Sequence, residues 1–355
     1  MPKIFSECNH NPPVQNRLLG GLTPREFLRH HWQKRSLHIR NAVPQFTGAV
    51  DERQLLHLAR RDDVESRIVQ RHGRKWETAH GPFASIAPKK TYWTVLVSGV
   101  NLHEPRADAL LRRFDFVPQA RLDDVMVSYA TPGGGVGPHV DSYDVFLLQG
   151  SGRRRWTVWE ASRKTYDCGP GDMLYLPPGV KHDGVALEPC FTYSIGFRAP
   201  RGAELGAAFL DWLHERGLPD ARYTDPRLRP SKAPARIPAE MIDFAAATLS
   251  RIRWSRADVA QFLGEYLSMP KPHVVFPAPK RPARAGMVRL DPKTQLLYSG
   301  TRFFINGEAF TVARRASAAL RRLADARVAE RAPLARAGLA RLISDWQRRG
   351  YVRNG

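Results

Sequence analysis

The chain has 355 residues, of which 55 are lysine or arginine and 34 are aspartate or glutamate, so its formal net charge is +21. This length predicts two or three domains, and a composition with 43% hydrophobic and 25% charged residues excludes a disordered chain. The sequence has no run of about 18 apolar residues, no apolar N-terminal signal and no Cys-x-x-Cys pair, so it predicts a cytoplasmic protein without a membrane span, a disulfide framework or a structural zinc cluster.

The N-terminal part of the chain, residues 1–60, is predicted to be helical with one short strand. A helix begins at Thr23-Pro-Arg-Glu26, where threonine can cap the helix, proline suits the first turn and glutamate completes a capping box. A strand is expected at 37–40, a second helix at 51–60 and a further strand at 64–71.

The segment from 91 to 200 changes character. Short runs of β-branched and aromatic residues alternate there with glycine and proline, which is typical of an antiparallel barrel or jelly roll. The expected strands are 92–100, 122–130, 140–148, 153–159, 173–176, 185–187 and 191–197.

After Pro200 the hydrophobic period becomes helical. Basic, proline-rich connections stand at 219–237 and 270–285. The expected elements are helices at 203–216, 238–250 and 256–268, a strand at 295–298, a strand pair around 303–307, and helices at 316–328 and 334–348.

One cluster of residues points to metal chemistry. His139 and Asp141 share a strand face, although such a pair alone is more typical of an ordinary hydrogen-bonded pair in a strand. The glycine-dense loop 131–138 immediately precedes this pair. Farther along the chain, His182 follows a tight turn and a short strand. Two histidines and one carboxylate on a small barrel form the facial triad of non-haem Fe(II) oxygenases, which leaves metal positions open.

The run Arg153-Arg154-Arg155-Trp156 offers a cation for a co-substrate carboxylate. Strand alternation places Arg154 and Trp156 on one face and the two flanking arginines on the other. An inward arginine can bind a carboxylate with two parallel hydrogen bonds, as 2-oxoglutarate would require. The alternative is a solvated basic turn in a protein of high positive charge.

Two stretches, GGGVGPHVDSYDVFLLQGSGRRRW and PGDMLYLPPGVKH, resemble the bacterial JmjC-type ribosomal oxygenases. The resemblance covers most of the chain, including LLGGLTPREFLRHHWQKRSLHIRNA and the barrel-closing YSIGFRAP. It implies an α+β fold, in which a double-stranded β-helix (jelly-roll or cupin) barrel precedes a helical dimerisation region and a C-terminal winged-helix domain. It also implies an Fe(II)- and 2-oxoglutarate-dependent dioxygenase that uses O₂ to hydroxylate an arginine of the sixteenth large-subunit ribosomal protein, with succinate and CO₂ as co-products.

The same resemblance assigns expected roles to individual residues. His139, Asp141 and His182 would bind iron, and no catalytic residue beyond these ligands is expected. Arg154, with Ser128, would bind 2-oxoglutarate. The substrate side chain would lie among Asp124, Met126, Tyr143 and Ser194, although core packing explains Met126 and Tyr143 equally well. Asp124 is expected to pair with the substrate guanidinium, and Tyr143 to stack on it.

The implied domains are a catalytic domain at 1–200, a helical dimerisation region at 201–275 and a winged-helix-like domain at 276–355. A homodimer is expected because the helices at 203–268 carry more apolar surface than one small layer buries. The segment between Trp159 and Gly169 is shorter than in some relatives, which affects the expected shape of the barrel rim rather than the metal site.

Two other functions stay open at this point. The first is a nucleic-acid-binding regulator with an inactive barrel, because a charge of +21 and a winged helix both favour polyanions. An arginine-rich composition can equally reflect a GC-rich genome. The second is an oxygenase for a small metabolite. The intact triad and Arg154 argue against the first, and the extra domains favour a macromolecular substrate over the second.

Overall fold

The computed structural model describes residues 17–277 and 286–354. Residues 1–16, in which the sequence predicts no apolar signal, and the end of the basic connection 270–285 lie outside the described residues. Within the described part, no helix combines the length and apolarity needed to cross a membrane.

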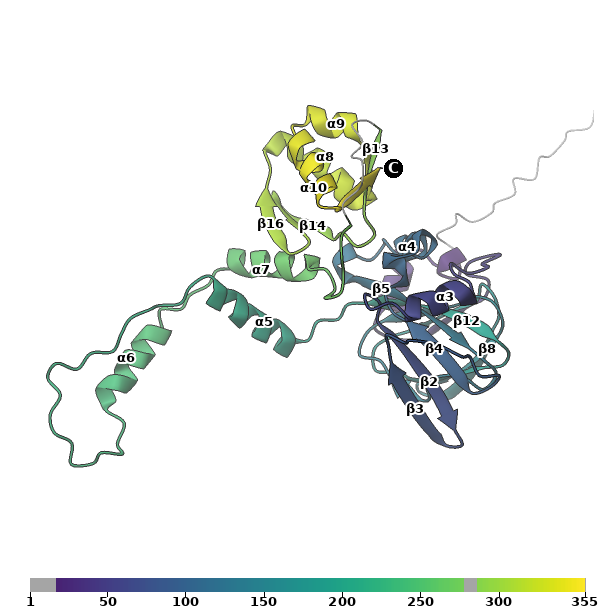
Figure 1. Cartoon of the computed structure of the whole chain (residues 1–355), viewed down its shortest axis with the longest axis horizontal. Helices are drawn as coiled ribbons and strands as arrows, with labels where there is room; N and C mark the ends of the chain where they lie inside the picture. The colour runs from purple at the N-terminus through teal and green to yellow at the C-terminus, as the bar shows by residue number, and fades with distance from the viewer. Residues whose placement is uncertain (1–16, 278–285, 355) are drawn as a thin grey trace, which may run out of the picture. The chain divides into compact units, whose positions relative to one another are not determined.

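The chain divides into two compact units, which are described separately (Figure 1). The first comprises the chain up to residue 199, residues 271–294 and the chain from 327 onward, and the second comprises 200–270 and 295–326.

Two antiparallel sheets form the body of the first unit. The larger has the order β1 (Leu37–Ile39), β10 (Met173–Leu176), β7 (Val145–Gln149), β12 (Cys190–Phe197), β5 (Leu122–Ala130), β4 (Trp93–Val97), β2 (Ser66–His72) and β3 (Lys75–His80). The smaller has the order β6 (His139–Val140), β11 (Lys181–Ala186), β8 (Arg154–Trp159) and β9 (Arg163–Cys168). Both sheets contribute side chains to one internal cavity, which confirms the predicted jelly roll.

The larger sheet is mostly buried, except at its edge, where β3 has no buried residue. Its outer face packs in the main hydrophobic core, which includes Phe27, Phe114, Phe146 and Phe197. The covering helices are α2 (Pro24–His30), α3 (Glu52–Ala59) and α4 (Pro105–Arg112), with 3₁₀ turns η1 (Val100–Leu102) and η2 (Gln119–Arg121). Alternate residues of β5 and β12 face the cavity and, apart from Met126, are polar or small. Because side chains alternate along a strand, one face of the sheet packs in the hydrophobic core and the other lines the cavity.

The predicted strand 140–148 is wrong, because the structure divides it between the two sheets. β6 ends at Val140 and β7 begins at Val145. Asp144, which lies in the bend, is fully buried. Its carboxylate accepts hydrogen bonds from the Tyr175 hydroxyl at 2.6 Å and the Gln33 side-chain amide at 3.0 Å. These bonds fix the crossing between sheets, which a continuous strand would not allow.

The predicted helix 334–348 is also divided, into α9 (Arg331–Arg336) and α10 (Ala340–Arg348). Gly338 adopts a φ of 86° between them, a conformation that ends a helix and favours glycine. The sequence patterns also missed α4, β3 and β9. A small sheet with the order β17 (Val328–Glu330), β13 (Met287–Leu290) and β18 (Val352–Asn354) completes this part of the first unit.

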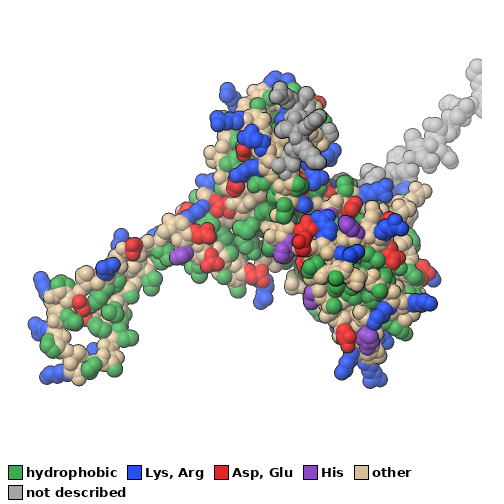
Figure 2. Space-filling model, viewed as in Figure 1, with side chains coloured by type: hydrophobic (Ala, Val, Ile, Leu, Met, Phe, Trp, Pro, Cys, Tyr) green, Lys and Arg blue, Asp and Glu red, His purple; other side chains and the backbone are tan. Residues whose placement is uncertain are grey.

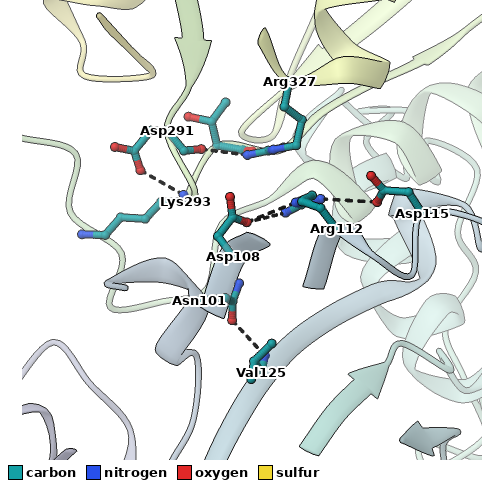
Figure 3. Close-up of polar contacts among 9 residues, drawn as sticks. Asn101, Asp108, Arg112, Asp115, Val125, Asp291, Lys293 and Arg327 are labelled. Atoms are coloured by element: carbon teal, nitrogen blue, oxygen red, sulfur yellow. Dashed lines mark hydrogen bonds and ion pairs between the residues drawn. The ribbon is translucent and has the colours of Figure 1, made fainter. Parts of the chain in front are cut away.

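Arg327, which is buried among these C-terminal elements, lies near charged residues of α4 (Figure 3). Arg327 donates hydrogen bonds to the main-chain oxygens of Asp291 and Thr294, and burial lowers its pKa to about 10. Asp108 and Arg112 form a salt bridge at 3.1 Å on α4 and contribute to the electrostatic environment of this arginine.

The second unit contains α5 (Gly202–Glu215), α6 (Ala239–Leu249), α7 (Arg256–Ser268), a sheet of β14 (Leu296–Ser299), β15 (Arg302–Ile305) and β16 (Glu308–Thr311), and α8 (Arg314–Ala326). Phe209 and Trp212 of α5 pack against Phe262 of α7. α6 has no buried residue. Figure 2 shows lysine and arginine side chains scattered over the visible face, with hydrophobic side chains gathered around the helices of this unit.

Candidate active site

Three side chains that can bind a metal meet at the edge of the smaller sheet. His139 in β6 and His182 in β11 are direct partners in the antiparallel ladder. The carboxylate oxygens of Asp141 lie 3.9 Å from Nε2 of His139 and 3.7 Å from Nε2 of His182. One ligand atom from each residue lies within 4.8 Å of the others, close enough to share one metal ion. The structure therefore brings together the three ligands that the sequence predicted.

Main-chain carbonyls orient both histidine rings. Nδ1 of His139 lies 2.9 Å from the oxygen of Gly137, and Nδ1 of His182 lies 2.9 Å from the oxygen of Val180. A carbonyl oxygen only accepts, so each Nδ1 carries the proton and donates it. Each Nε2 then presents a lone pair toward Asp141, as a metal ligand must. Burial lowers the pKa of His182, which favours the neutral ring that binds metal.

Two glycines allow aromatic rings to pack close to these ligands. Gly137 has a φ of 81°, and a Cβ there would lie 2.9 Å from the indole nitrogen of Trp76. Gly184 lies in β11 beside Trp156, and a Cβ there would collide with that ring. The glycine-rich loop is thus needed for close packing around the ligands.

The triad opens into a cavity of about 610 Å³ between the two sheets. Every residue that the sequence assigned to this site lies on its wall, namely Asp124, Met126, Ser128, His139, Asp141, Tyr143, Arg154, His182 and Ser194. The alternation predicted for Asp124, Met126 and Ser128 on β5 and for Arg154 on β8 therefore agrees with the cavity wall, although Asp123 also lines the cavity. Val145, Leu147 and Trp156 add apolar surface to the cavity wall.

Arg154 has the features expected of a carboxylate receptor. It is 4% exposed, and its Nε and Nη2 are buried without a hydrogen-bond partner among the described residues. Leaving two guanidinium donors unpaired costs free energy, so this site fits an anionic ligand. The flanking arginines point outward, since Arg153 pairs with Glu188 and Arg155 pairs with Asp167. The solvated basic turn is therefore excluded for Arg154.

Asp124, by contrast, is already paired. Its Oδ2 accepts a hydrogen bond from the Lys271 ammonium at 2.8 Å and another from the Gly99 amide at 2.9 Å. Burial raises the pKa of Asp124, and the nearby ammonium opposes this shift. The sequence predicts only a substrate guanidinium as the partner of Asp124. The structure adds Lys271 to it.

Tyr143 lies at the mouth of the cavity with 40% of its surface exposed. Burial of its hydroxyl, followed by the negative charges of Asp141 and Asp124, raises its pKa to about 12. The phenol is therefore neutral at physiological pH and presents a flat ring to the opening.

Several residues of the cavity were missed by sequence reasoning. Arg67, Thr78 and His80 reach it from the β2–β3 hairpin. The alternating residues of β3 after the turn at Gly73 were an available hairpin signal. Lys271 had no local signal, because it stands in a proline-rich stretch far along the chain from Asp124.

Comparisons with known proteins agree with this geometry. The family model of the JmjC domain matches residues 109–168 and 166–205, and that of the ROXA-like winged helix matches 251–351. The ribosomal protein uL16 3-hydroxylase of Escherichia coli is 38% identical over 278 residues, which are 72% of this chain and 74% of that protein. The chain belongs to the JmjC ribosomal oxygenase family.

Other ribosomal oxygenases support this membership. A probable ribosomal oxygenase of Haemophilus influenzae is 38% identical over 210 residues, 52% of each protein. The solved structure of YcfD, a ribosomal oxygenase from E. coli, superimposes with a TM-score of 0.80 and 32% identity, covering 94% of this chain and 98% of that one. The same protein has been solved with cobalt and 2-oxoglutarate.

Proposed function

We propose that this protein is an Fe(II)- and 2-oxoglutarate-dependent oxygenase that hydroxylates an arginine side chain of the large-subunit ribosomal protein uL16. The main support for this proposal is that the His139–Asp141–His182 triad and the unpaired buried donors of Arg154 line one cavity in a member of this family. Iron, 2-oxoglutarate and O₂ together supply the oxidising chemistry for an unactivated C–H bond, and release succinate and CO₂.

The residues on the cavity wall divide into three roles in this proposal. His139, Asp141 and His182 hold iron and leave its remaining positions open. Arg154 binds the far carboxylate of 2-oxoglutarate, and the Ser128 hydroxyl, on the facing sheet, assists it.

The substrate arginine lies nearer the cavity mouth, among Asp124, Met126, Tyr143 and Ser194. A guanidinium is always charged and has five donors, so a buried site needs a carboxylate to receive it. Asp124 supplies that carboxylate, and the ring of Tyr143 supplies a stacking face.

The test uses the iron-loaded protein with 2-oxoglutarate, O₂ and a peptide from uL16. Succinate formation that rises with the peptide, together with a gain of one oxygen atom on an arginine, supports the proposal. Turnover indifferent to every ribosomal peptide would instead favour a small-metabolite oxygenase. No turnover with iron bound would favour a nucleic-acid-binding regulator.

The setting of this activity is part of the same proposal. We place the protein in the cytoplasm, where ribosomal proteins are made, and assign catalysis to residues 1–200, dimerisation to 201–275 and an accessory winged-helix-like role to 276–355. The charge of +21 favours encounter with RNA-rich particles, so direct nucleic-acid binding is secondary to hydroxylation.

A further inference from the structure

Lys271 lies where a substrate cation is expected. Its ammonium lies 2.8 Å from Oδ2 of Asp124 and 3.3 Å from Oδ1 of Asp123, and both aspartates line the cavity that contains the triad. Burial alone would lower the pKa of Lys271, but the two carboxylates raise it above its ordinary value, so the side chain is a cation. The acidic end of the cavity therefore already holds an internal positive charge.

Charge balance opposes a third cation at this position. Asp123 also faces Arg198, whose Nε lies 3.6 Å from its Oδ1. Two carboxylates are thus matched by two cations, Arg198 and Lys271. An arginine side chain that approaches Asp124 would meet Lys271 on the same carboxylate oxygen, and two cations held side by side in a partly desolvated site repel each other. Replacing Lys271 keeps the balance.

A second cavity can accept the Lys271 side chain when it leaves Asp124. About 200 Å³ of space lies beside the first cavity, and Lys271 lines it together with Asp63, His103 and His273. Glu65 and Ser98 line both cavities, so the two adjoin. A lysine chain is long and flexible, and its ammonium can turn from Asp124 toward Glu65 without leaving carboxylate surroundings.

We propose that Lys271 is an internal stand-in for the substrate, which neutralises Asp124 in the resting enzyme and is displaced by the incoming arginine guanidinium. This inference rests on the proposed function. Lys271 then acts as a specificity residue, since a side chain without a positive charge cannot replace it. A guanidinium can replace the lysine, because it can form two parallel hydrogen bonds with the Asp124 carboxylate, whereas the ammonium forms one.

The kinetic test compares Lys271→Met and Lys271→Arg with the native protein, using an arginine peptide at saturating 2-oxoglutarate. Lys271→Met removes the competitor, so the peptide KM falls by at least about fivefold while kcat changes by less than about twofold. Lys271→Arg can bind the Asp124 carboxylate with two parallel hydrogen bonds, so it competes more strongly with the substrate and raises the peptide KM. Lys164→Met, at an exposed lysine of β9, is the matched control and leaves both constants unchanged. An unchanged or higher KM in Lys271→Met contradicts the inference.

A second measurement does not depend on turnover or on a variant that folds. The native iron-loaded enzyme with 2-oxoglutarate is treated anaerobically with an amine-reactive label, and modification of Lys271 is followed by mass spectrometry. The arginine peptide increases labelling of Lys271, and the same peptide with neutral citrulline does not. Equal labelling with both peptides overturns the inference. If the native enzyme hydroxylates no arginine peptide, the proposed function fails instead, so the two failures are distinguishable.

Discussion

The three proposed iron ligands differ in how much the fold depends on them. The side chain of His182 is 2% exposed and packs in the interior, whereas those of His139 and Asp141 are 36% and 22% exposed at the cavity wall. Truncating His182 would therefore leave a cavity as well as remove a ligand. His139 and Asp141 separate metal binding from folding more cleanly.

We predict that His139→Ala and Asp141→Ala lose iron and activity while keeping the native melting temperature. Activity should fall by more than the roughly hundredfold that follows loss of a residue that only orients a ligand. Iron content by elemental analysis and thermal melting check this prediction. Two variants that retain full iron and activity would contradict the proposed triad.

Arg154 differs sharply from its neighbours in burial and pairing. We predict that Arg154→Met raises the KM for 2-oxoglutarate at least about thirtyfold, since loss of a buried charge pair costs about 2–5 kcal/mol. Arg153→Met and Arg155→Met should change it little, because these side chains are 60% and 51% exposed and pair with surface carboxylates. Steady-state kinetics on the three variants decide, and equal effects at all three positions would refute the assigned role.

At the residue scale, strand alternation predicted most of the candidate site. Asp124, Met126 and Ser128 follow one another at every second position, so a correct strand places all three on one wall. The sequence could not predict Lys271, because its contact with Asp124 depends on how the chain returns after the helices of the second unit. Local sequence patterns predict which residues share a face of a strand, but they do not predict contacts between residues that are far apart in the chain.

At the element scale, the bend between β6 and β7 follows His139 and contains Asp141, two of the three proposed iron ligands. Asp144 holds this bend from the core side through Tyr175 and Gln33, while Asp141 and Tyr143 point toward the cavity. The sequence favoured one continuous strand there, since Val140 and the apolar run from Val145 share strand-forming character. The buried acid that interrupts them was the available signal.

We predict that Asp144→Ala lowers the free energy of unfolding by about 2–4 kcal/mol, because it leaves the buried Tyr175 hydroxyl without its acceptor. Iron should also be retained less well, since the bend carries Asp141. Asp167→Ala, which removes an exposed ion pair with Arg155, should cost less than about 1 kcal/mol and serves as the control. Urea unfolding measures both, and equal losses would show that Asp144 has no special role.

At the scale of the whole molecule, the residues proposed for chemistry and those proposed for association belong to different units. The residues assigned to iron, 2-oxoglutarate and substrate all belong to the first unit. The exposed apolar helix α6 belongs to the second, where Ile242 is 56% exposed and Leu249 is 65% exposed. An apolar helix without a buried residue gains nothing from folding alone, which supports the proposed homodimer.

We predict that the native protein is a dimer in solution and that Ile242→Glu combined with Leu249→Glu makes it a monomer. These residues are seven apart and therefore share a helix face, so two carboxylates there oppose burial in an interface. Ala247→Glu, which lies away from that face, is the control and keeps the dimer. The monomer should retain iron and peptide-independent succinate formation, because the residues proposed for catalysis lie in the other unit. Light scattering at micromolar concentration measures the mass, and a native mass near the 40.1 kDa of one chain would refute the dimer.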